Sequence, residues 1–313
     1  MRLMVPASTL EATQELIDNG ADDIYVGSTS SFFNYYSFNG RASIAKNGKQ
    51  VLPTMDEIKA ICSYVHSRDG CVYFLANIPI INGGSKQFYN KFLQYVNDGI
   101  NAGADYIILG DISTIKWVTK KYPKIKIVAS SYLEVQNELT LKMLEDMGVT
   151  QAILSYQSTL EEIQELCAVS NIQIEVFGHG GCSFYVGTCN MFHEMGESVN
   201  IGYPCRALYE VKQEEISFGE MRVLDCFKMC SLCKLKELDS YGVHSLKIVG
   251  RDLAASYILE IVKVYSRTLQ LCRAGESLNA AALDLPTWWK KSWCSPGNLC
   301  RYGGECIGCN NSK

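Results

Sequence analysis

The sequence predicts an α/β protein built as a single (β/α)8 barrel of the TIM type, and three observations support this fold class. Segments with helical periodicity alternate along the chain with short apolar segments rich in β-branched residues. Several helical segments end at a glycine that a strand follows almost at once. The chain has 313 residues, enough for a barrel of about 250 residues with an appendage.

Four glycines mark the change from helix to strand. They are Gly20, Gly103, Gly148 and Gly242, and the segments DIYVG, YIILG, QAILS and SLKIVG follow them closely. Glycine accepts the left-handed conformation that ends a helix, so each position predicts a helix C-terminus. Short apolar strands after helices predict βα units with a buried parallel sheet.

The complete pattern contains eight strands and eight helices. The predicted strands cover residues 2–6, 23–27, 71–77, 105–110, 125–130, 151–155, 172–178 and 244–249. The predicted helices cover 9–18, 54–67, 86–101, 112–121, 136–146, 159–168, 231–240 and 253–272, with capping expected near Thr9, Thr54, Ser113 and Thr159. Eight alternating pairs favour a closed barrel over the alternative, an open sheet that carries residues 179–230 as an inserted subdomain.

One connection is far longer than the others. About fifty residues, 179–233, separate the seventh strand from the seventh helix, and they form a predicted cluster-binding loop of a barrel that spans 1–275. Residues 276–313 form a second predicted unit, a cysteine-rich C-terminal tail. Because the catalytic residues of such barrels lie at the carboxyl ends of the strands, this loop is expected at the functional face.

The fourteen cysteines indicate a metal site. Six of them lie in the long loop, at 182, 189, 205, 226, 230 and 233. The chain begins without the apolar stretch of a signal peptide, which predicts a cytoplasmic protein, and a reducing compartment disfavours disulfides. Clustered thiols then favour a 4Fe–4S cluster, although any single cysteine could be a small buried apolar residue. The spacing Cys226-x3-Cys230-x2-Cys233 matches the radical S-adenosylmethionine motif, but that motif belongs after the first strand of a barrel.

The tail contains a second set of thiols. Cys294, Cys300, Cys306 and Cys309 are separated by glycines and a proline, so the segment can wrap around one metal. A second 4Fe–4S cluster and a tetrahedral zinc ion both fit this spacing. The alternative is a frayed terminus with idle thiols.

Several blocks of the sequence resemble the collagenase-like peptidase family U32. The resemblance covers residues 1 to about 272 and is strongest in EVFGHGGC at 175–182, in Pro204-Cys205-Arg206 and in Gly242-Val243 with the following SLKIVGR. The blocks Tyr25-x-Gly27 and FNGRA at 38–42 are similar too. This family includes oxygen-independent hydroxylases of the ubiquinone pathway and of RNA.

The resemblance implies a function and a ligand set. It implies oxygen-independent hydroxylation at a 4Fe–4S cluster, with prephenate as the oxygen donor. The cluster ligands that it implies are Cys182, Cys189, Cys205 and Cys230, which leaves Cys226 and Cys233 as additional thiols. Some relatives work as pairs, so a heteromeric partner of the same family is a further expectation.

Four residues are predicted to assist this chemistry. Asp111 and His179 follow predicted strands and are the candidate acid–base residues. Asp111 could instead cap the helix at Ile112, and His179 could form a fixed hydrogen bond in a turn. Arg41 and Arg251 could bind a carboxylate substrate such as prephenate, with surface ion pairs as the alternative.

Two other functions compete with hydroxylation. Peptide hydrolysis would need a thiolate or a metal, because the sequence has no HExxH motif and no Gly-x-Ser-x-Gly elbow. An electron-transfer or redox role in a heteromer is the non-enzymatic alternative. With a net charge of −4 and no cluster of basic residues, the composition favours a small-molecule or peptide substrate over nucleic acid. No segment is apolar over the roughly 18 residues that a membrane span needs.

Overall fold

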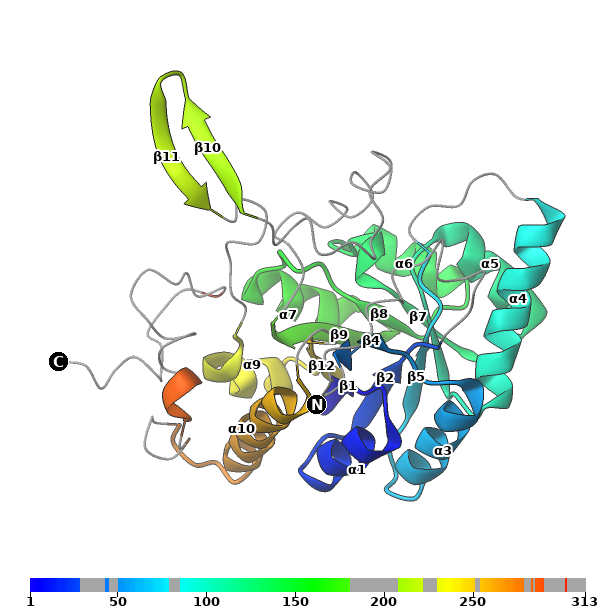
Figure 1. Ribbon diagram of the computed structural model, residues 1–313, viewed down its shortest axis with the longest axis horizontal. Helices are drawn as coiled ribbons and strands as arrows, with labels where there is room; N and C mark the ends of the chain where they lie inside the picture. Colours follow the sequence, from blue (N-terminus) through cyan, green and yellow to red (C-terminus); the bar gives the residue numbers. More distant parts are fainter. Residues whose placement is uncertain are drawn as a thin grey trace.

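A closed barrel of eight parallel strands forms the centre of the molecule (Figure 1). The computed structural model describes residues 1–28, 43–44, 50–78, 85–180, 208–221, 230–250, 254–278, 283, 285–289 and 302. The strand order around the barrel is β1-β12-β9-β8-β7-β6-β5-β2, and every neighbouring pair is parallel. The predicted (β/α)8 barrel is confirmed, and the open sheet is excluded.

The strands and helices lie close to their predicted positions. The barrel strands are β1 (Arg2–Pro6), β2 (Asp23–Val26), β5 (Val72–Leu75), β6 (Tyr106–Leu109), β7 (Lys126–Ala129), β8 (Gln151–Ile153), β9 (Gln173–His179) and β12 (Ser245–Ile248). The helices around them are α1 (Leu10–Asp18), α3 (Met55–His66), α4 (Lys86–Asn101), α5 (Ile112–Lys121), α6 (Glu138–Asp146), α7 (Leu160–Val169), α9 (Leu235–Ser240) and α10 (Ala255–Arg273). The helix predicted at 231–240 opens with a 3-10 turn, Leu232–Lys234, and becomes α-helical at Leu235.

Short polar side chains start most of these helices. Thr54 and Thr159 each form a capping box. The threonine hydroxyl accepts a hydrogen bond from the N–H of the third helical residue, and the glutamate side chain of that residue accepts one from the threonine N–H. Thr9 caps α1 through the N–H of Ala12. The expected cap at Ser113 is wrong, because α5 begins at Ile112 and the carboxylate of Asp111 already accepts from the Ser113 N–H.

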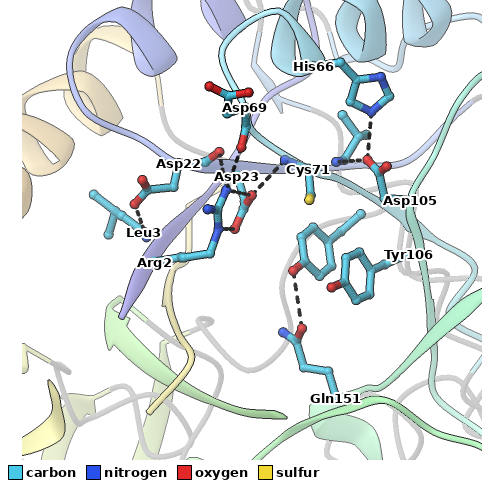
Figure 2. Close-up of polar contacts among 12 residues, drawn as sticks. Arg2, Leu3, Asp22, Asp23, His66, Asp69, Cys71, Asp105, Tyr106 and Gln151 are labelled. Carbon is cyan, nitrogen blue, oxygen red and sulfur yellow. Dashed lines mark hydrogen bonds and ion pairs between the residues drawn. The ribbon is translucent and has the colours of Figure 1, made fainter. Parts of the chain in front are cut away.

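Two of the predicted helix-ending glycines are followed by an aspartate that forms the same kind of hydrogen bond at the amino ends of the strands. All four predicted helix-ending glycines have positive φ. Two residues after Gly20, the carboxylate of Asp22 accepts from the Leu3 N–H at 2.7 Å. Two residues after Gly103, the carboxylate of Asp105 accepts from the Val72 N–H at 2.8 Å (Figure 2). Each aspartate therefore joins the start of its own strand to the preceding strand in the sequence.

The interior of the barrel carries a buried polar network. The Lys247 ammonium lies 2.9 Å from a carboxylate oxygen of Glu175, and the Gln151 amide donates to the other carboxylate oxygen. The Tyr73 hydroxyl donates to Gln151 and the Tyr73 ring stacks on Tyr106, with centroids 4.2 Å apart (Figure 2). Because strands β8, β9 and β12 supply the charged and amide groups, the network joins three neighbouring strands inside the barrel.

Two features were not predicted. Residues 208–221, inside the predicted loop, contain a hairpin of β10 (Tyr209–Gln213) and β11 (Ile216–Met221) that stands away from the barrel (Figure 1). Gly219 has φ +78 near a register shift in this hairpin, which is the geometry of a β-bulge. A second short pair is formed by β3 (Ser43–Ile44) and β4 (Gln50–Val51).

The start of the predicted tail packs on the barrel. Leu283, Leu285 and Trp289 are buried and belong to the main hydrophobic cluster between the strands and helices. Tyr302 packs against the same cluster. Among the described helices, none combines the length and the apolar character that crossing a bilayer requires.

Candidate functional site

The candidate site lies at the carboxyl end of β9, where the chain enters the segment that holds most of the loop cysteines. Two glycines allow β9 and β12 to approach closely here. A Cβ on Gly178 would lie 2.5 Å from Leu246 Cγ, so a side chain cannot fit there without displacing the Leu246 side chain on β12. Gly180 has φ +68, and a Cβ there would lie 2.8 Å from the Val249 carbonyl oxygen. Both glycines of the motif thus stand where a side chain would clash with β12 or with the residue that follows it.

His179 ends β9 and is buried. Its side chain packs against the rings of Tyr265 and Trp289, with centroid separations of 5.6 and 4.6 Å. The Tyr265 hydroxyl oxygen lies 3.4 Å from His179 Nδ1. Burial lowers the pKa of His179 to about 3, so the imidazole is neutral at physiological pH. The acid–base role of His179 stays a prediction.

Cys230 is fixed beside His179. The two residues form an antiparallel β-bridge, so the chain returns from the loop directly onto the strand from which it left. The next residue, Ser231, donates to the Gly178 carbonyl through both its N–H, at 2.9 Å, and its hydroxyl, at 3.0 Å. The Tyr265 hydroxyl donates to the same carbonyl at 2.7 Å and lies 3.7 Å from Cys230 Sγ.

Asp111 caps the amino end of α5, which is the structural alternative to its predicted catalytic role. It precedes α5, and its carboxylate accepts from the N–H groups of Ser113 and Thr114 at 2.7 and 3.0 Å. One carboxylate oxygen, Oδ1, makes both contacts. The catalytic role of Asp111 stays a prediction.

Of the ten other predicted site residues, the structure describes only Cys230. Arg41 and Arg251 lie outside the described residues, as do the three remaining loop ligands and the four tail cysteines (Cys182, Cys189, Cys205, Cys294, Cys300, Cys306 and Cys309). Within the part of the chain that is described, no three His, Cys, Asp or Glu side chains gather as a metal site. The structure thus brings together His179 and Cys230, and the rest of the ligand set stays a prediction.

Sequence reasoning missed three residues of this region. Tyr265 lies on the buried face of α10, where an aromatic side chain reads as core. Ser231 lies between Cys230 and Cys233 in the sequence, and Trp289 lies in the predicted tail. Only the position of Ser231 next to a candidate ligand could have drawn attention to it.

The sequence matches peptidase family U32 over residues 8–299. The chain is a member of this family. That match confirms the family resemblance that the sequence predicted.

Two relatives of similar sequence are named for RNA hydroxylation. The 23S rRNA 5-hydroxycytidine C2501 synthase of Escherichia coli is 26% identical over 277 residues, which cover 86% of this chain and 39% of that protein. The tRNA hydroxylation protein P of Escherichia coli is 22% identical over 336 residues, covering 90% of this chain and 70% of that protein. The chain therefore spans well under half the length of the first relative. The prediction that nucleic acid is an unlikely partner is not borne out, because relatives of similar sequence are named for RNA.

A solved structure of a family member supports the fold alone. The U32 peptidase Mk0906 superposes with a TM-score of 0.51 at 11% sequence identity, over 80% of this chain and 93% of that one. At this identity, the comparison indicates a shared barrel and carries no argument about substrate.

Proposed function

We propose that this U32 family member is an iron–sulfur hydroxylase that acts at the carboxyl face of its barrel. The observation that carries the proposal is the anchoring of Cys230 against the end of β9, by the bridge to His179 and the contacts of Ser231. Cys182 follows His179 by three residues in the sequence. One proposed ligand, Cys230, is thus fixed at the end of β9, and a second follows that strand closely in the sequence, which supports a cluster held by a rigid scaffold.

The proposed ligands of a 4Fe–4S cluster are Cys182, Cys189, Cys205 and Cys230. Thiolates are the soft donors that such clusters prefer, and Cys230 is partly buried against the hydrophobic core beside Tyr265. When bound, the cluster would supply the redox chemistry that side chains lack. The tail cysteines are proposed to hold a second cluster or a zinc ion.

The protein's own groups would bind and orient the substrate. Arg41 and Arg251 are proposed to bind the carboxylates of prephenate, the proposed oxygen donor, because guanidinium groups pair with carboxylates through two parallel hydrogen bonds. A neutral His179 can donate or accept one hydrogen bond without a change of charge. The relatives named for rRNA and tRNA make an RNA nucleotide the first acceptor to test, followed by small molecules and peptides.

Metal analysis tests the proposal directly. Protein purified without oxygen is expected to be brown and to contain about four iron and four sulfide per cluster. Cys182→Ser and Cys230→Ser should each lose the loop cluster, whereas Cys306→Ser should affect only the tail metal. Cys167→Ser is the matched control, because Cys167 is a partly buried thiol on α7 outside both cysteine groups. Colourless protein that contains only zinc would refute the iron–sulfur proposal.

Mass spectrometry under nitrogen tests the reaction. RNA from cells that lack this protein, incubated with the holoprotein and prephenate, should gain one oxygen atom on a nucleoside, and no gain should occur without prephenate. A parallel incubation with unstructured peptides tests the alternative function, peptide hydrolysis. Peptide cleavage by metal-free protein, without oxygen transfer to any acceptor, would replace hydroxylation with hydrolysis.

A further inference from the structure

The hydroxyl of Tyr265 lies at the centre of the contacts that hold Cys230. Tyr265 comes from the middle of α10 and is 0% exposed. Its oxygen accepts from the Ser231 N–H at 3.1 Å and donates to the Gly178 carbonyl at 2.7 Å. The same oxygen lies 3.7 Å from Cys230 Sγ, within the range of a hydrogen bond to sulfur. One phenol therefore contacts the strand end, the returning chain and the candidate ligand.

Packing alone does not account for this hydroxyl. A phenylalanine would fill the same space in the core, and burying a polar hydroxyl costs free energy unless it is hydrogen-bonded. The Gly178 carbonyl also accepts from the N–H and the hydroxyl of Ser231, so it keeps two donors when the single phenol proton turns to another acceptor. What the phenol adds is a donor next to the sulfur of Cys230.

A donor at this place would act on a cluster in a defined direction. A metal-bound thiolate carries more negative charge than a thiol and is the stronger hydrogen-bond acceptor. Hydrogen bonds to the sulfurs of an iron–sulfur cluster are among the factors that set its reduction potential, because they stabilise the more negative, reduced state. Removing such a bond therefore lowers the potential.

We infer that Tyr265 is a positioning residue of the cluster site. Its single hydroxyl proton, which points to the Gly178 carbonyl in this structure, turns to the sulfur of Cys230 when that sulfur is a metal-bound thiolate, the stronger acceptor. The inference rests on the proposed function, since it needs Cys230 to be a cluster ligand. It assigns a role to a residue of α10, an element that supplies no ligand of its own.

The test compares Tyr265→Phe with a matched tyrosine. Tyr95 on α4 is also buried, and its hydroxyl accepts from the Ser28 N–H at 3.1 Å and lies 3.3 Å from the Leu75 carbonyl oxygen. Tyr95→Phe therefore removes a similar buried hydroxyl from a different helix. Each variant is purified anaerobically as holoprotein, and the midpoint potential of the loop cluster is measured by redox titration followed by electron paramagnetic resonance.

Tyr265→Phe should shift the midpoint potential to a lower value and speed iron loss to a chelator by about tenfold, the change that corresponds to one hydrogen bond. Tyr95→Phe should match the wild type in both. Equal potentials for all three proteins would overturn the inference. If Cys230→Ser keeps a full loop cluster, the ligand assignment itself fails, which is a distinct result.

Ser231→Ala provides a second variant if Tyr265→Phe does not fold. It removes the side-chain hydrogen bond to Gly178 and leaves the phenol in place. Because the phenol still donates to the sulfur, the potential should stay at the wild-type value, while iron loss becomes faster. A lowered potential in Ser231→Ala would contradict the assignment of the potential to Tyr265.

Discussion

At the scale of single residues, Asp111 shows how one carboxylate can fit a catalytic and a structural role. Its contacts with the N–H groups of Ser113 and Thr114 satisfy two donors that the first turn of α5 leaves without helical partners. These contacts need an oxygen acceptor but no titratable group. Asparagine can therefore replace aspartate in the cap and cannot replace it as an acid or base.

This difference gives a test of Asp111. Asp111→Ala should lower the free energy of unfolding by about 1 kcal/mol, whereas Asp111→Asn should stay within a few tenths of the wild type. Urea denaturation followed by circular dichroism measures both. Wild-type hydroxylation in Asp111→Asn would establish the cap as its only role, and a stable but inactive Asp111→Asn would establish the catalytic prediction.

The isolated cysteines differ in chemistry from exposed thiols. Burial raises the pKa of Cys62 to about 12 and that of Cys167 to about 11. The thiolate is the reactive form, so a raised pKa makes both residues slow nucleophiles at neutral pH. At pH 8 about 0.1% of a thiol with a pKa of 11 is ionised, against about a quarter of an ordinary cysteine.

Alkylation with iodoacetamide, followed by peptide mass spectrometry, checks this expectation. Cys167 should react roughly a hundredfold more slowly than glutathione at pH 8, and its rate should rise about tenfold for each pH unit up to pH 11. Cys62 should react more slowly still, since only 2% of the residue is exposed. Labelling of Cys167 at the rate of glutathione at pH 8 would show that burial does not raise its pKa.

At the scale of elements, the sequence was most informative where one residue type is forced by the backbone. The helix-ending glycines and the threonine caps located the barrel strands to within one or two residues, because few other residues fit a positive φ or a first-turn acceptor. The β10–β11 hairpin escaped prediction, since glutamates stand at the tight turn where Asn-Gly or Asp-Gly is the usual signal. In the hairpin, Glu214 itself takes the positive φ of 54°.

The ion pair of Glu175 and Lys247 was equally hard to foresee. Both residues stand within apolar strand patterns, and sequence alone does not tell which neighbours a barrel places side by side. The register pairs Lys247 with Phe177, two residues along β9 from Glu175, so both side chains point into the barrel. Glu175 is fully buried and Lys247 is 7% exposed.

A double-mutant cycle tests what this pair contributes. Lys247→Met leaves a carboxylate buried without its cation and should cost about 3–5 kcal/mol of unfolding free energy, and Glu175→Gln should be destabilising for the same reason. The double variant Glu175→Gln/Lys247→Met should be more stable than the sum of the two single effects predicts, because no unpaired charge remains. Additive losses in urea denaturation would mean that the two groups act independently.

At the scale of the whole molecule, the barrel and the start of the tail form one packed body. Trp289 is fully buried and contacts the rings of His179 and Tyr265, so the chain after α10 returns to the carboxyl face beside Cys230. The spacing of the tail cysteines predicted a separate metal-binding unit but could not predict this return, since a single tryptophan carries no directional signal. The barrel fold could be predicted from the sequence because the strand–helix pattern is repeated eight times. The contacts of Trp289 with His179 and Tyr265 involve single residues, and no repeated pattern predicts them.

This packing predicts that the tail contributes to global stability. Trp289→Ala should lower the free energy of unfolding by about 3–5 kcal/mol, because it removes a large side chain from a closed core. Trp288→Ala is the matched control. Trp288 is only partly buried and contacts Tyr257 and Glu260 of α10, so its removal should lower the free energy of unfolding clearly less. Denaturation followed by circular dichroism and by near-ultraviolet absorption should give one coincident transition for both variants. If Trp289→Ala left the barrel transition unchanged and altered only a separate early phase, the tail would be an independent unit and its docking beside His179 would not stabilise the barrel.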